Sequence, residues 1–342
     1  MKVSASGLLL LLLLAQPSAS SQVESRPARP PAAGKALSAA ARKAGIDPAE
    51  AARLDSKPLY RLTPAELDRY LKLLQAKEPS LRGRVITLAR KALGQPYKLY
   101  LLGEFPFEIL DPDPLYSLKA SDCVTFVEHV YAMALSRNWR SFFVTLQRIR
   151  YMGGEIGLTT RNHFTIPDWE PSNSWLVREI RVPAGPGGTR PLVVKTGRRA
   201  FFGKWGLGKD FPEKTVRTEY YTPKGIPRVL PRLREGDMVQ VIRSFREGSG
   251  EGWCGHVGLV GRLPGGTVTF INSTTPKVKE EPILHYMRRN LDLNPSRKAR
   301  KRPLFLGFRF LRLQEDPLAE LRKIDGPSAP RLTIPARRGR PR

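Results

Sequence analysis

The feature that most constrains the fold is a change of pattern along the chain. The first half carries helix-start signals placed ahead of apolar residues that recur three and four positions apart. The second half carries short runs rich in β-branched and aromatic residues, separated by turn residues. Helices followed by strands, rather than a regular alternation of the two, indicate an α+β fold.

The helix starts in the first half follow known capping chemistry. Asp47-Pro48 is an N-cap followed by a first-turn proline, and Thr63 with Glu66 forms a capping box. A helix also needs a stop, and Gly94 supplies one for the helix that Ser80 caps. The predicted helices begin at Asp47-Pro48, at Thr63-Pro64, at Ser80, at Ser121-Asp122 and at Trp139. The fourth is the strongest, and it runs to about Ser136.

The second half is predicted to form a sheet. Pro264-Gly265-Gly266 lies between two strand-like runs and is typical of a hairpin turn. The predicted strands are Trp175–Val182, Leu192–Lys195, Val216–Tyr221, Met238–Arg243, His256–Val260, Thr267–Asn272 and Leu304–Leu313.

The N-terminus is typical of a secretory signal peptide. Lys2 precedes a short apolar run from Gly7 to Ala15, and small residues follow at 18–20. An uncleaved anchor helix is the alternative, but the run is short for a membrane span. We predict a signal peptide over 1–20, a flexible leader over 21–45, an N-terminal helical segment over 46–80, a main domain over 81–314 and a basic disordered tail over 315–342. The mature protein is then exported, to the periplasm or the cell exterior.

The charge balance indicates a polyanionic partner. The 342 residues contain 58 Lys and Arg against 31 Asp and Glu, a net charge of +27. Export and the absence of aromatic residues within the basic runs argue against nucleic acid. A cell-wall polymer or an anionic envelope surface, contacted through the basic tail, fits better. The alternative is that the arginine-rich surface is merely solvated.

Cys123 is the candidate nucleophile. It lies at the start of the strongest predicted helix, where backbone N–H groups and the helix dipole favour a thiolate. The alternative is a small buried hydrophobic residue, which is the usual role of a free cysteine. The chain has one other cysteine, Cys254, so a disulfide scaffold is excluded.

A thiol nucleophile needs a base, and His256 is the best placed of the four histidines. It opens a strand after a glycine-rich loop, and the next strand ends at Asn272, whose amide can hold the imidazole ring. His129 points to another side of the Cys123 helix, and His285 is expected at the surface. The alternative for His256 is a half-buried strand residue without a catalytic role.

These residues lie in motifs that are similar to those of a known family. It resembles the NlpC/p60 superfamily of cell-wall cysteine peptidases, and within it the N-acetylmuramoyl-L-alanine amidase-like branch of the DUF1460 type. The blocks that carry the resemblance are Gly94-Gln95-Pro96-Tyr97, Asp122-Cys123-Val124-Thr125-Phe126-Val127-Glu128, Arg161-Asn162-His163-Phe164 with Asp168-Trp169, and Gly236-Asp237 with His256-Val257-Gly258. They occur in the family's order between residues 94 and 274.

The resemblance implies a papain-like fold in which the helix of Cys123 packs on an antiparallel sheet that carries His256. It implies that Tyr97 lies near the thiol, that the substrate is peptidoglycan or a muropeptide, and that no metal or other cofactor takes part. The sequence departs from the family at Asn272, where the superfamily often has histidine, and at Phe164, where the branch usually has tyrosine. The segment 181–221 has no clear match and is interpreted as an insertion.

The function expected from these residues is hydrolysis of an amide bond by a Cys123–His256–Asn272 triad through a thioester. The predicted bond joins N-acetylmuramic acid to L-alanine. The alternatives are a γ-D-glutamyl-diamino acid endopeptidase and a non-catalytic, basic wall-binding protein.

The predicted substrate-binding residues are Tyr97, Arg161, His163, Asp168 and Trp169. Arg161 and His163 are candidates for binding stem-peptide carboxylates. For Arg161 and Asp168 the alternative is structural ion pairing, and for Trp169 it is packing beneath the loop. Cys254 lies two residues before His256. It is either an inert thiol, which we favour, or a partner that oxidation links to Cys123, if Cys254 and His256 face the same side of one strand.

Overall fold

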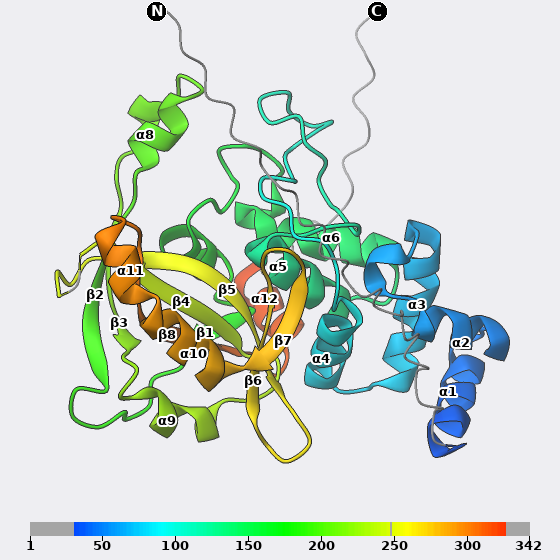
Figure 1. The fold of residues 1–342 in the computed structure, drawn as a ribbon. Coiled ribbons are helices and arrows are strands. Elements are labelled where there is room, and N and C mark those ends of the chain that lie inside the picture. Colours follow the sequence, from blue (N-terminus) through cyan, green and yellow to red (C-terminus); the bar gives the residue numbers. More distant parts are fainter. Residues whose placement is uncertain (1–30, 247, 326–342) are drawn as a thin grey trace, which may run out of the picture.

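The computed structural model describes residues 31–246 and 248–325, which form a helical part and an antiparallel sheet (Figure 1). This confirms the α+β class. The predicted signal peptide, the predicted leader before residue 31 and the tail beyond residue 325 lie outside the described residues. Among the described residues no helix is long and apolar enough to cross a membrane.

The predicted helix starts are confirmed by their caps. Asp47 accepts hydrogen bonds from two backbone N–H groups at the start of α2 (Pro48–Ser56). Thr63 and Glu66 form both bonds of a capping box on α3 (Pro64–Lys77), and Ser80 caps α4 (Leu81–Lys91). These side chains satisfy N–H groups that the first turn of a helix leaves without partners.

Two terminal predictions are wrong where the structure describes them. Residues expected in a flexible leader form α1 (Pro31–Ala44), which buries Leu37, Ala40 and Ala41. Residues expected in a disordered tail form α12 (Pro317–Asp325), where Leu321 is buried. In both cases tertiary packing stabilises a short segment whose own apolar pattern is weak.

Within the described residues the sheet has eight strands, all paired antiparallel. Its order is β2-β3-β8-β4-β5-β6-β7, and β1 pairs with β8. The strands are β1 (Val177–Glu179), β2 (Thr189–Lys195), β3 (Thr215–Tyr221), β4 (Met238–Ser244), β5 (Trp253–Arg262), β6 (Val268–Ser273), β7 (Val278–Pro282) and β8 (Leu304–Leu313). Each predicted strand overlaps one of them, whereas β7 was not predicted.

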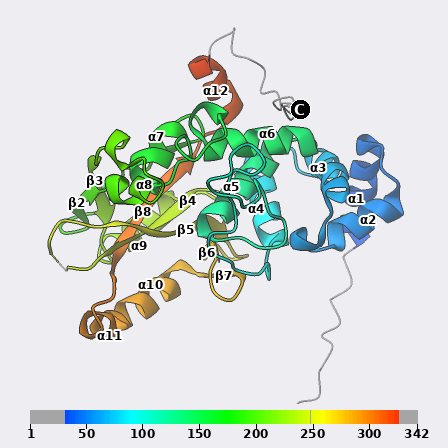
Figure 2. The ribbon, with the colours of Figure 1, turned by 90° about the horizontal axis from the view of Figure 1, so that it is seen from above.

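Helices cover both faces of the sheet (Figure 2). The helices α5 (Cys123–Ala134) and α6 (Trp139–Arg150) lie on one face, where Val257 and Leu259 of β5 join their apolar cluster. The helices α10 (Ile283–Asp292) and α11 (Asn294–Ala299) lie on the other face. The cluster around α5 also contains Leu37 and Leu67, so the N-terminal helices share one core with the sheet.

The segment 181–221, which was interpreted as an insertion, extends the sheet, and we keep the name insertion for it. It forms the β2–β3 hairpin, and Tyr221 of β3 pairs with Phe308 of β8. Between the two strands lies the short helix α8 (Arg198–Gly203), which projects from the body of the molecule (Figure 1). The remaining short helices are α7 (Glu170–Ser172) and α9 (Ile226–Val229).

Candidate active site

Cys123 is the first residue of α5, and the helix start is firmly capped. The Asp122 carboxylate accepts a hydrogen bond from the Thr125 N–H at 2.8 Å, and the Asp122 N–H donates to the Thr125 hydroxyl at 2.9 Å. The backbone N–H groups of Val257, Val124 and Cys123 lie near enough to the sulfur to oppose the rise in the pKa of its thiol. The last two belong to the helix start, whereas Val257 belongs to β5.

The Val257 contact exists because β5 and β6 separate at this point. The two strands pair only over Leu259–Arg262 of β5, so the preceding part of β5 has no ladder partner on that edge. The backbone groups of Val260 bond to Asp237 and Gly236, on the side of β4. Successive residues of a strand direct their backbone groups to opposite edges, so the N–H of Val257, three residues earlier, faces the open edge. The start of α5 fills this opening and brings the thiol next to the strand that carries His256.

His256 and Asn272 meet across the same opening. The Nε2–H of His256 donates to Oδ1 of Asn272 at 2.9 Å, and the ring packs against Phe270 and Tyr286. The pairing leaves Nδ1 as the nitrogen that can accept a proton, and no hydrogen bond occupies it within the described part of the chain. Gly258 permits this approach, because a Cβ there would lie 2.8 Å from the Cβ of Asn272.

Burial keeps both reactive groups neutral. It lowers the pKa of His256 to about 4, although the bond to Asn272 opposes this. Burial, followed by the nearby Asp122 carboxylate, raises the pKa of Cys123 to about 12. The N–H groups around the sulfur favour a thiolate, as the sequence predicted, but burial outweighs them. At rest, therefore, the thiol of Cys123 and the imidazole of His256 are both neutral.

A hydroxyl network that the sequence analysis missed fixes the Cys123 segment to β6. Ser121 Oγ donates to Gln95 Oε1 at 2.9 Å, and Ser273 Oγ donates to the Ser121 carbonyl at 2.9 Å. Ser121 precedes the nucleophile by two positions, and Ser273 follows Asn272. The only signal in the sequence is their position beside matched blocks, and the pairing itself spans 152 residues.

Tyr97 lies beside this network. Its segment forms a bridge with Ser121, and its N–H donates to the Pro276 carbonyl at 3.0 Å. Burial, followed by the nearby Cys123 sulfur, raises the pKa of Tyr97 to about 12. The phenol is therefore a neutral hydrogen-bond donor near the thiol.

Arg161 and His163 use their polar atoms within the protein. Arg161 forms ion pairs with Glu104 at 3.2 Å and Asp111 at 2.7 Å. The Nε2–H of His163 donates to the Leu158 carbonyl at 2.7 Å, and its Nδ1 accepts from Arg161 Nε at 3.4 Å. Both residues brace loops, and their role in binding carboxylates stays a prediction.

Asp168 and Trp169 also have internal partners. Asp168 pairs with Arg198 at 2.7 Å and with Lys214 at 2.9 Å, both from the insertion, and not with Arg161. The Trp169 indole is buried, and its N–H donates to Glu128 at 3.0 Å. Structural ion pairing and packing, the alternatives for these residues, are the roles seen in the structure.

Cys254 and His256 do not share a face, so the condition set for a disulfide between Cys254 and Cys123 is not met. Val241 pairs with His256 and Ile242 with Cys254, so a bulge at Gly255 separates them. Cys254 packs with the apolar cluster of Cys123, and its thiol contacts the His256 carbonyl at 3.5 Å. Both cysteines are free, and burial raises the pKa of the Cys254 thiol.

The remaining histidines lie apart from the chemistry. His129 is buried on α5, its Nδ1–H donates to the Thr125 carbonyl, and burial lowers its pKa to about 3. His285 is exposed on α10, as predicted. Among residues 31–246 and 248–325, no group of three or more His, Cys, Asp or Glu side chains is placed to hold a metal ion.

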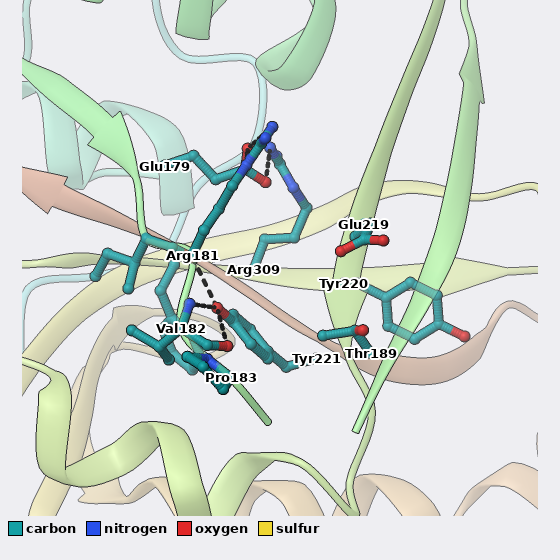
Figure 3. Close-up of a pocket in the computed structure, with 11 residues that line it drawn as sticks. Glu179, Arg181, Val182, Pro183, Thr189, Glu219, Tyr220, Tyr221 and Arg309 are labelled. Carbon is teal, nitrogen blue, oxygen red and sulfur yellow. Dashed lines mark hydrogen bonds and ion pairs between the residues drawn. The ribbon is translucent and has the colours of Figure 1, made fainter. Parts of the chain in front are cut away.

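A pocket of about 260 Å³ lies where β8 changes neighbour from β1 to β3 (Figure 3). Its charged wall is a closed network, in which buried Arg309 bonds to Glu179 at 3.1 Å and to Glu170 at 2.6 Å. Arg181 pairs with the same Glu179 at 2.7 Å. Cys123 and His256 do not line this pocket, so we do not assign the chemistry to it.

The fold and the site place the chain among α+β proteins that carry a cysteine at a helix start and a histidine on an adjoining antiparallel sheet. The chain belongs to the N-acetylmuramoyl-L-alanine amidase-like family, whose model matches residues 87–293. The matched range contains Cys123, His256 and Asn272. No curated protein matches the chain.

Two solved structures share the fold. A protein of Legionella pneumophila str. Philadelphia 1, of the DUF1460 family, has a TM-score of 0.64 at 20% identity and covers 74% of this chain and 95% of its own. An N-acetylmuramoyl-L-alanine amidase of Bacteroides uniformis ATCC 8492 has a TM-score of 0.50 at 20% identity and covers 68% of this chain and 99% of its own.

Proposed function

We propose that the protein is an exported cysteine amidase that hydrolyses the bond between N-acetylmuramic acid and L-alanine in peptidoglycan or muropeptides. The observation that carries the proposal is a cysteine at a helix start whose sulfur lies near the backbone N–H of Val257, on the same strand as His256, whose ring bonds to Asn272. The family match and the name of the Bacteroides uniformis relative support the choice of bond. The arrangement also supports the papain-like interpretation of the fold.

The chemistry follows from the neutral resting pair. His256 Nδ1 takes the thiol proton as the sulfur attacks the amide carbonyl, so charge develops only when a substrate is present. The Cys123 N–H at the helix start donates to the developing oxyanion. The imidazolium then protonates the leaving amine of L-alanine. Water, deprotonated by the neutral imidazole, attacks the thioester and releases the sugar acid with the free thiol.

The test is a digest of purified muropeptides by the wild type and by Cys123→Ala, analysed by mass spectrometry. Cys254→Ala is the matched control, because it removes the other free thiol in the same apolar cluster. The proposal predicts free stem peptide and bare sugar from the wild type and from the control, and neither product from Cys123→Ala.

Other outcomes contradict the proposal in distinct ways. A sugar that keeps L-alanine and D-glutamate moves the cut to the endopeptidase bond. Intact substrates with every variant, together with binding to sacculi in low salt, indicate a wall-binding protein instead. Export is tested separately, by finding the mature protein in the periplasmic or culture fraction with its N-terminus near residue 21.

A further inference from the structure

A cluster of exposed apolar side chains lies beside the segment that carries Cys123. We call it the apolar rim, and its residues are Leu99, Tyr100, Phe105, Phe107, Ile109 and Leu110. The described part of the chain exposes twelve large hydrophobic residues, and six of them lie between residues 99 and 110. Tyr100 and Ile109 are 86% and 84% exposed. Such a concentration on a protein surface marks a contact site rather than ordinary surface composition.

The rim is held in place next to the nucleophile. The Lys98 N–H donates to the Ser121 carbonyl at 3.1 Å, two positions before Cys123. Further along the loop, backbone bonds join Gly103 to Pro114 and Phe105 to Asp113. The loop is therefore a braced projection whose apolar side chains face water.

The loop also reverses the usual orientation of polar and apolar groups. The Glu104 carboxylate is fully buried and pairs with Arg161, as does Asp111. Glu108 accepts a hydrogen bond from the Leu158 N–H at 2.8 Å. Three acids of the loop are thus bonded inward while the six residues of the rim are exposed. A loop that only met water would place these groups the other way round.

Basic residues surround the rim. The Trp205 indole N–H donates to the Leu110 carbonyl at 3.3 Å. This bond joins the loop to the segment between β2 and β3, which contains α8. The two project on the same side of the molecule (Figure 1). The exposed basic residues of the loop and of the β2–β3 connection that carries α8 are Lys98, Lys119, Arg199, Lys204, Lys209 and Lys214, and their exposed acids are Asp113, Asp210 and Glu213. The surface is therefore apolar at its tip and cationic around it.

We propose that the apolar rim docks the protein on an anionic lipid bilayer. Aliphatic and aromatic tips enter the boundary between headgroups and acyl chains, and the surrounding cations contact the phosphates. Self-association on this face is disfavoured, because it would bring the cations of one copy against those of another. A sugar is recognised by hydrogen bonds, and three acids of the loop are already bonded within the protein.

The test is co-sedimentation of the purified protein with vesicles. One set contains equal parts of phosphatidylcholine and phosphatidylglycerol, and the other contains phosphatidylcholine alone. The rim variant is Tyr100→Ser/Ile109→Ser, and the control is Leu293→Ser/Ile324→Ser, which removes two exposed apolar residues elsewhere. Thermal unfolding of each variant shows that it is folded, and turnover is not needed for the readout.

The wild type and the control should bind the anionic vesicles, and the rim variant should bind about tenfold more weakly or less. Binding should weaken with salt and with neutral vesicles. Equal binding by the rim variant would overturn the proposal, because charge alone would then account for the affinity. Binding to sacculi but not to vesicles would do so too, as would a dimer that the rim variant converts to a monomer.

Discussion

His256 and His163 are both partly buried histidines in matched sequence blocks, and their ring nitrogens have different partners. Both ring nitrogens of His163 are bonded within the protein, to the Leu158 carbonyl and to Arg161. His256 binds Asn272 through one nitrogen and keeps the other available. Burial lowers the pKa of both, to about 3 for His163 and to about 4 for His256. A perturbed pKa therefore does not identify the base, whereas an unoccupied nitrogen on the strand that contacts the Cys123 thiol does.

The same contrast holds for the surroundings of the two residues. Among the described residues His256 takes part in no ion pair, although Arg243, Lys279 and Glu281 lie near enough to shift its pKa, so its proton can move without breaking one. The Arg161–His163 region is a lattice of ion pairs and aromatic contacts, in which Phe201 and Phe202 enclose the His163 ring. The His256–Asn272 region can therefore exchange a proton, whereas the Arg161–His163 region holds the segment 181–221 against the rest of the domain.

The sharpest test of this comparison exchanges each histidine for alanine. His256→Ala should lower kcat by about 10³-fold, because it removes the general base, and should leave the melting temperature nearly unchanged. His163→Ala should lower the melting temperature and leave kcat within a few-fold at temperatures where it is folded. The measurements are muropeptide turnover and thermal unfolding. A folded His163→Ala variant without activity would break the comparison.

The second prediction concerns the ion pair between Asp168 and Arg198 of the insertion. Asp168→Asn leaves buried Arg198 without its partner carboxylate and should lower the free energy of unfolding by about 3 kcal/mol. Urea unfolding measures this loss. Glu251→Gln, which removes a pair with Lys195 at the surface, is the control and should cost well under about 1 kcal/mol. Equal losses would show that Asp168 does not fasten the insertion.

The third prediction concerns the orientation of the base. Asn272→Ala removes one hydrogen bond to His256 and should lower kcat about tenfold, while KM changes little. Asn272→His restores a ring partner of the kind that the superfamily often has, and should recover part of the loss. If the alanine variant matched the wild type, the His256 ring would be held by Phe270 and Tyr286 alone.

The fourth prediction concerns pH and has the smallest effect. His256 acts as a base only when neutral, so the rate should fall as the pH drops through about 4, the pKa of its buried ring. Above that value the rate should stay level through about pH 8, because the thiol also remains neutral. A resting thiolate–imidazolium pair would instead lose its imidazolium and give a bell-shaped profile. The pH dependence of kcat/KM decides between them.

Local chemistry explains how much of the fold could be predicted. The caps at Asp47, Thr63, Ser80 and Asp122 mark helix starts because their side chains bond to backbone within three residues. The helix α1 was missed because its buried face consists largely of alanine, which gives little hydrophobic contrast. The strand β7 was missed because its sequence, Val-Lys-Glu-Glu-Pro, buries a glutamate that pairs with Arg289. Only tertiary partners make such segments regular.

In the candidate site, too, local signals could be predicted and tertiary partners could not. Cys123 and His256 were predicted because each lies within a matched block, and Asn272 because it ends the next predicted strand. The Val257 N–H donor was not predicted, because any residue type supplies a backbone N–H and only the separation of β5 from β6 frees this one. The partners of Asp168 were not predicted because they come from the insertion, at a distance in sequence that no local pattern encodes.

The central claim is that Cys123 forms a thioester with the acyl side of the cleaved bond. The direct test is mass spectrometry of the acid-quenched wild-type protein during turnover of a muropeptide. The account predicts an adduct on the peptide that contains Cys123, with the mass of the N-acetylmuramyl acyl group. Accumulation of products with no adduct on Cys123 at any time point would contradict it.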